Sequence, residues 1–89
     1  MVSIQTNMKW DASALNKYNK MLNQIPIFHR RIAQEVVNKK AEAGALARSS
    51  AQVEEVDIVQ AFLSEVPKAF YSMMIRIMDD AGFDYKKYI

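Results

Sequence analysis

The chain has 89 residues, of which 51% are hydrophobic and 25% charged, and its formal net charge is +2. That length supports one hydrophobic core, and the composition is that of a globular domain rather than a disordered chain. Cysteine is absent, which excludes disulfides, thiolate metal sites, cysteine-held iron–sulfur clusters and a catalytic thiol. No apolar run is long enough to span a bilayer and no secretory signal is recognisable, so a cytoplasmic protein is expected.

Glycine and proline are scarce, with two residues of each, and no Asn-Gly or Asp-Gly pair marks a hairpin turn. These features predict an all-α fold, a compact bundle of three to four short helices. Residues 10–82 are expected to form the helical domain, after a flexible lead-in over 1–9. An aromatic and basic tail over 83–89 either folds back, docks on a partner or frays.

The first helix is predicted over residues 12–23. Asp11 is a good N-cap, because its carboxylate can accept a hydrogen bond from a backbone N–H of the first turn. Trp10 precedes this cap and can pack against Ala14 or Leu15 as a hydrophobic staple. Stacking of the indole on a ligand is the alternative role.

The second helix is predicted over residues 25–44. Pro26 suits the first turn of a helix, and Gly44 suits the residue just past its end, where a left-handed backbone is needed. Apolar residues at spacings of three and four give this helix one apolar stripe, formed by Phe28, Ile32, Ala33, Val36, Val37 and Ala41. Residues 45–52 are compatible with a loop or with a further helical turn.

Two more helices are predicted, one starting near Val53 with acidic residues in its first turn, and one over residues 68–81 closed by Gly82. The apolar residues of helix 68–81 extend further around the helix than the rest of so small a domain can easily cover. The residues predicted to bind a partner or ligand there are Phe70, Tyr71, Met73, Met74 and Ile77. Methionine adapts to partner contacts and equally fills gaps in a core, and both alternatives stay open.

The positive charge is concentrated in the first half of the chain. Residues 1–48 contain eight Lys and Arg against three Asp and Glu, whereas residues 49–89 contain four against seven. A basic patch is predicted at Arg30, Arg31, Lys39 and Lys40. Such a patch is either a solvated helix face or a contact for an anionic partner such as nucleic acid.

Signals of catalysis are missing from the sequence. His29 is the only histidine, and no serine or aspartate stands at a spacing that implies a catalytic triad. No glycine-rich phosphate loop, paired metal-binding histidines or cofactor fingerprint is present. We therefore expect no catalytic residue, no metal site and no cofactor in this chain. His29 is expected to have a structural role, and proton donation within a larger complex is the alternative.

A longer pattern resembles a known family. It comprises Trp10, then Ile25-Pro26-Ile27-Phe28-His29-Arg30-Arg31, then Ala41, Gly44 and Val53-Glu54-Glu55. This pattern is similar to the small helical domain that closes the B subunit of light-independent protochlorophyllide reductase, over about residues 8–63. In that family the domain lies over a tetrapyrrole substrate near a subunit interface. The resemblance implies an accessory role, with Trp10, Pro26, Phe28 and Gly44 as its structural motif.

The sequence also departs from this family. Glu54 stands where the family has Thr at the start of its last helix, and Asn38 stands where a Glu is usual. The methionine-rich helix has no counterpart, and the reductase's catalytic body and cluster-binding cysteines are missing. The resemblance therefore implies a binding module rather than a reductase.

The function predicted from the sequence is thus a small non-catalytic module. It would dock on a larger redox enzyme subunit, or on an apolar ligand such as a tetrapyrrole, or self-associate through helix 68–81. The alternative is a basic, histone-like or helical nucleic-acid-binding protein.

Overall fold

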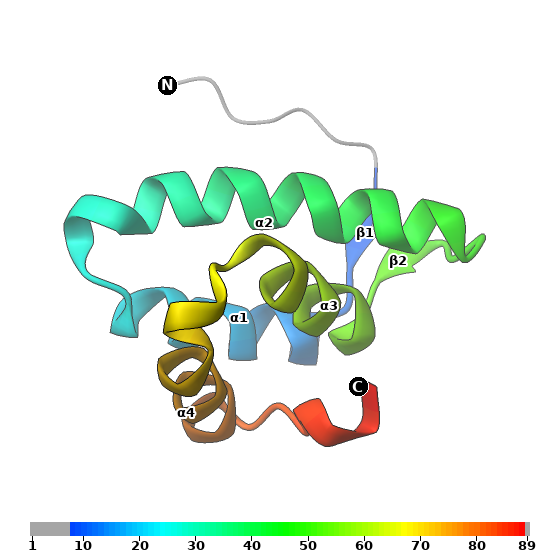
Figure 1. The fold of residues 1–89 in the computed structure, drawn as a ribbon. Coiled ribbons are helices and arrows are strands. Elements are labelled where there is room, and N and C mark those ends of the chain that lie inside the picture. Colours follow the sequence, from blue (N-terminus) through cyan, green and yellow to red (C-terminus); the bar gives the residue numbers. More distant parts are fainter. Residues whose placement is uncertain (1–7, 89) are drawn as a thin grey trace.

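Four α-helices account for most of the described chain, which comprises residues 8–88 of the computed structural model, and they confirm the predicted all-α class (Figure 1). The helices are α1 (Ala12–Gln24), α2 (Ile27–Ala47), α3 (Glu55–Glu65) and α4 (Tyr71–Ala81). Two 3₁₀ helices, η1 (Lys68–Phe70) and η2 (Tyr85–Tyr88), and two strands, β1 (Lys9–Trp10) and β2 (Gln52–Val53), complete the fold. The predicted lead-in lies mostly outside the described residues.

The first helix begins where the sequence predicted. The Asp11 carboxylate accepts a hydrogen bond from the backbone N–H of Ala14 at 2.9 Å, which caps α1. The helix ends at Gln24, and Ile25 is extended because the residue before a proline is pushed out of the α region.

The two strands were not predicted. They pair in parallel, with Lys9 beside Gln52 and Trp10 beside Val53. The Asp11 N–H also donates to the Val53 carbonyl at 2.8 Å. Val53 therefore belongs to β2 and the third helix starts two residues later than predicted. The pairing holds the start of α1 beside the start of α3.

The second helix does not end at Gly44, so the predicted end of this helix is wrong. It continues to Ala47, and the left-handed residue that follows it is Ser49, with φ of 58°. Gly44 is instead an interior position of α2 at the crossing with α3, where a Cβ would lie 3.5 Å from Asp57 Oδ1. Residues 45–47 are thus the further helical turn that the sequence left open.

The two glycines are expected to respond oppositely to alanine. Gly44→Ala should raise the free energy of unfolding by about 0.5–1 kcal/mol, because alanine is the better helix former and 3.5 Å is ordinary contact. Gly82 ends α4 at φ of 98°, so Gly82→Ala should lower it by about 1–2 kcal/mol. Urea unfolding followed by circular dichroism measures both, and shifts of the same sign would contradict these assignments.

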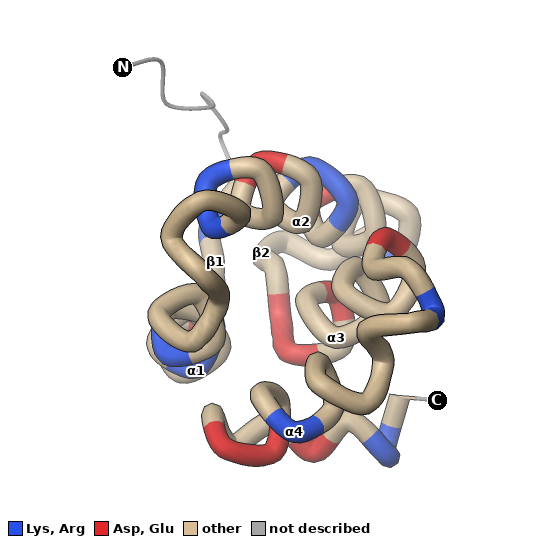
Figure 2. The backbone as a smooth tube through the Cα atoms, turned by 60° about the vertical axis from the view of Figure 1, so that its left-hand side comes forward, with Lys and Arg blue, Asp and Glu red and all other residues tan. Residues whose placement is uncertain are grey.

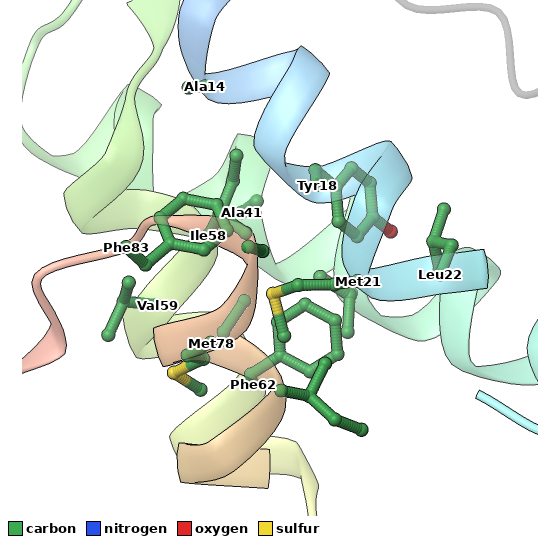
Figure 3. Close-up of a cluster of buried hydrophobic side chains, with 14 of the residues drawn as sticks. Ala14, Tyr18, Met21, Leu22, Ala41, Ile58, Val59, Phe62, Met78 and Phe83 are labelled. Carbon is green, nitrogen blue, oxygen red and sulfur yellow. The ribbon is translucent and has the colours of Figure 1, made fainter. Parts of the chain in front are cut away.

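The core lies where α1, α3 and α4 meet beneath α2 (Figure 3). Tyr18 is at its centre, with its ring edge-to-face on Phe62 at 5.8 Å and stacked on Trp10 at 5.5 Å. The C-terminal tail folds back onto this core: Phe83 is buried and Tyr85 and Tyr88 pack against the cluster. The packed unit therefore extends beyond residue 82, where the domain was predicted to end.

Candidate functional site

An open groove of about 520 Å³ lies between the first half of α2 and the corner where α3 leads into α4. Apolar side chains form almost all of its lining, and His29 and Glu65 are its only titratable residues. From the α2 side the lining comprises Ile25, Pro26, His29, Ile32, Ala33, Val36 and Val37. From the α3–α4 side it comprises Phe62, Glu65, Val66, Pro67, Phe70, Met73 and Met74.

Both prolines of the chain border this groove. Val66 is extended at the end of α3, with φ of −86° and ψ of 133°, because Pro67 follows it. Ile25 is extended for the same reason before Pro26. Each proline thus turns the chain at one wall of the groove. Pro26 was predicted at the start of the second helix, but its place in a groove wall was not predicted.

The residues predicted to contact a partner from helix 68–81 divide into three groups. Phe70 and Met73 lie at the groove rim, with 52% and 41% of their surface exposed. Met74 is buried at the groove lining, and Ile77 is packed in the core. Tyr71 is half-buried, and its hydroxyl donates to the Leu63 carbonyl. Of these five residues, Phe70 and Met73 therefore offer the most surface to a partner.

The α2 side of the groove was not among the contact residues predicted from the sequence, which all lie on helix 68–81. Ile32 and Val36 belong to the predicted apolar stripe of the second helix, but they face outward. Val37 and Ala41, from the same stripe, face the core. The signal was available, since the apolar positions of this helix span more than one face.

Lys and Arg occur at separate places along α2 (Figure 2), and the four predicted basic residues point in different directions. Arg30 is half-buried and donates to the carbonyls of Asn23, at 3.3 Å, and Ile25, at 3.1 Å. Arg31 lies 3.6 Å from Glu35, both exposed. Lys39 and Lys40 are exposed, and successive residues of a helix point about 100° apart. These cations therefore surround α2 instead of forming a single anion-binding surface.

Three other residues of the predicted structural motif are Trp10, Pro26 and Phe28. Trp10 and Pro26 contact other parts of the fold, whereas Phe28 is exposed. Trp10 is half-buried, and its indole N–H donates to Glu42 at 3.1 Å, which ties β1 to α2. Pro26 is the N-cap of α2 and lines the groove. Phe28, close to the groove in the first turn of α2, is exposed.

Asp57 is buried, and the polar residues around it join two helices. Asp57 receives two hydrogen bonds from Arg48, at 2.9 and 2.7 Å, and one from the Glu54 N–H at 2.8 Å. The hydrogen bond to Asp57 raises the pKa of Arg48 above its ordinary value, so Arg48 stays charged. The cluster fastens the end of α2 to the start of α3.

Acid–base chemistry has little support among the described residues. Burial raises the pKa of Tyr18 well above its usual value, and its hydroxyl donates to Asn38 Oδ1 at 2.7 Å, so it stays protonated. No group of three or more His, Asp or Glu in residues 8–88 is arranged to hold a metal ion. No helix in this part of the chain is long and apolar enough to cross a membrane.

The geometry defines a small helical protein whose most developed surface feature is an open apolar groove. Comparison of the chain with models of protein families, with curated proteins and with solved structures found no match. The groove and the residues around it are therefore the features of this chain that bear on its function.

Proposed function

We propose that this chain is a non-catalytic binding module that takes an apolar, helical segment of a larger protein into the groove between α2 and the α3–α4 corner. The observation that carries this proposal is the groove itself, whose volume of about 520 Å³ is in the range of binding sites. Its elongated wall along α2 suits the apolar face of an amphipathic helix.

A protein segment fits this surface better than an enclosed small molecule. The apolar surface continues beyond the groove, onto Phe28 and over the rim formed by Phe70 and Met73. A small ligand in the groove would leave these side chains in water, whereas a protein partner would cover them. The methionines at the rim and floor adapt their shape to such a partner.

The resemblance to the reductase domain supports a redox enzyme subunit as the larger partner. Pro26 and His29 of the matching segment line the groove, and Phe28 extends its apolar surface. In the family that this segment resembles, the domain lies near a subunit interface. Nothing favours the nucleic-acid alternative, because the basic residues of α2 point in different directions.

The test uses a fluorescein-labelled synthetic amphipathic helix with leucines at positions i, i+3, i+4 and i+7. We expect saturable binding by fluorescence anisotropy, and we expect Met73→Asp to weaken it at least about tenfold, because a charge would be desolvated at the rim. Leu15→Asp is the matched control, since Leu15 is exposed to 39% and Met73 to 41%, each in the first turn or so of a helix. The control should bind like the unchanged chain.

Two results would overturn the proposal. One is equal binding by the Met73→Asp and Leu15→Asp variants, which would place the peptide outside the groove. The other is saturable binding of a porphyrin, followed by absorbance, from a chain that does not bind the peptide. That second result would assign the groove to an apolar ligand.

A further inference from the structure

We infer that α2 also forms an antiparallel pair with α2 of a second copy of this chain, through a stripe on its outer face. This outer stripe consists of His29, Ile32, Val36, Lys39, Ala43 and Leu46. Figure 1 shows α2 as one straight helix along an edge of the molecule, with the other helices on one side of it. The inference goes beyond the proposed function, because the outer stripe continues past the groove to the far end of α2. His29, Ile32 and Val36 belong to both surfaces, so a second copy and a groove peptide compete for them.

The spacing of the outer stripe is that of a coiled-coil seam. Its positions alternate three and four residues apart along the whole of α2, which is the repeat that keeps a seam facing a partner helix. Ile32 and Leu46 are 63% and 67% exposed, and Ala43 is exposed as well.

The far half of the outer stripe, from Lys39 to Leu46, points away from the core, whereas His29, Ile32 and Val36 also line the groove. Val37, Ala41 and Ala45 are the buried face of α2, and at about 100° per residue the outer stripe lies on nearly the opposite side. The outer face of a helix in a monomeric domain is ordinarily polar. On α2 it is apolar except for His29 and Lys39, so a partner is needed to cover it.

The charges favour an antiparallel second copy. A parallel pair would place Lys39 against Lys39, which is repulsive. An antiparallel pair centred between Val36 and Lys39 places Lys39 of each copy opposite Val36 and beside Glu35 of the other, and two-fold symmetry repeats this contact. A single lysine in such a seam sets its register at some loss of stability.

The side-chain sizes agree with that register. Ile32 of one copy lies opposite Ala43 of the other, which sets a large residue against a small one. His29 lies opposite Leu46, with Phe28 beside it. The seam is therefore self-complementary in shape and in charge.

The interface is small, which sets the expected affinity. From His29 to Leu46 the seam is roughly 25 Å long at about 1.5 Å per residue. One such helix pair is at the lower end of specific interfaces, near ~1,200 Å² in total. We therefore expect a dimer with a dissociation constant in the micromolar range.

Sedimentation velocity over the micromolar range tests the dimer. We expect a concentration-dependent species of twice the chain mass of 10.2 kDa. Lys39→Glu should set two carboxylates side by side, at positions 39 and 35 of opposite copies, and weaken the dimer about tenfold or more; Glu35→Lys should do the same with two ammonium groups. The combined exchange of both charges should restore association to within about threefold. Leu15→Asp serves again as the control away from α2.

Cross-linking tests the orientation, which is simple because the chain has no cysteine. Ile32→Cys and Ala43→Cys chains are mixed and treated with a short bismaleimide. An antiparallel pair brings these two positions together, while position 32 of one copy is separated from position 32 of the other by about 16 Å. We expect the mixed product to form far faster than either self-linked product.

The outcomes separate this inference from the proposed function. A chain that stays monomeric throughout, or a combined charge exchange that fails to restore association, overturns the α2 dimer. Peptide binding in the groove by that same monomeric chain would leave the proposed function intact. Preferred linking of one Ile32→Cys chain to another would overturn the antiparallel orientation.

Discussion

Replacement of Asp57 by alanine is expected to lower the free energy of unfolding by about 3 kcal/mol, because a helix cap and charge-assisted hydrogen bonds are lost together. Asp57 is the buried charged residue among residues 8–88, with 3% of its surface exposed. Its carboxylate receives both hydrogen bonds of the Arg48 fork and also the Glu54 N–H at the start of α3. The cap contributes about 1 kcal/mol and the charge-assisted hydrogen bonds about 1.5–3 kcal/mol.

The effect falls below the largest values for broken buried ion pairs because Arg48 keeps access to water. Its side chain is 38% exposed, so it can be hydrated once Asp57 is gone. Domains of this size have about 5–15 kcal/mol of stability in total, so the loss is a large fraction. Thermal unfolding by circular dichroism should show a decrease of more than about 10 °C.

Arg31→Ala is the matched control for this ion-pair argument. Arg31 and Glu35 are 3.6 Å apart and both are mostly exposed, so their pair should contribute less than about 0.5 kcal/mol. Asp57→Asn adds a finer comparison, because an amide oxygen can still accept from the Glu54 N–H while the pairing with Arg48 is lost. We expect Asp57→Asn to be intermediate. Equal stabilities of the Asp57→Ala and Arg31→Ala variants would contradict the assigned role.

Local chemistry explains the parts of the fold that the sequence predicted correctly. Asp11 begins α1 and Gly82 ends α4 as expected, because a cap or a left-handed glycine acts within a few residues of itself. The end of α2 was predicted wrongly because a distant residue decides it. Gly44 looks like a helix end in isolation, whereas Arg48 one turn later pairs with Asp57 of α3. The parallel strands likewise depend on contact between residues more than forty positions apart.

The sequence predicted contact residues on one wall of the groove only, because the packing that forms the groove joins residues that are distant in the sequence. The apolar excess of helix 68–81 led to Phe70 and Met73 as predicted contact residues, and both are exposed at the groove. Periodicity gives a helix an apolar face but does not say which neighbour covers it. Whether Met74 and Ile77 are buried or exposed therefore depends on how α4 packs on the core, and both are buried there. Ile32 belongs to the predicted apolar stripe of the second helix and is exposed for the same reason.

Replacement of Phe62 by alanine is expected to have the largest effect, lowering the free energy of unfolding by about 3–5 kcal/mol. Phe62 is 1% exposed, packs edge-to-face on Tyr18 at 5.8 Å and reaches the groove lining with its outer edge. Alanine there removes aromatic contacts and leaves a void that the surrounding helices fill only in part. Urea unfolding measures the loss, and a change below about 1.5 kcal/mol would show that this core collapses around the void.

Phe28→Ala makes the same chemical change where the side chain is 87% exposed, and it should alter the free energy of unfolding by less than about 0.5 kcal/mol. The comparison is made at a protein concentration where the chain is monomeric, so that association through α2 does not contribute. The two variants then compare a phenylalanine that packs in the core with one that is exposed on the surface. Phe62 holds α3 on the core, while Phe28 extends the apolar surface proposed to bind. A Phe28→Ala variant that is as stable as the original chain and binds the amphipathic peptide more weakly would show that this exposed phenylalanine serves binding rather than folding.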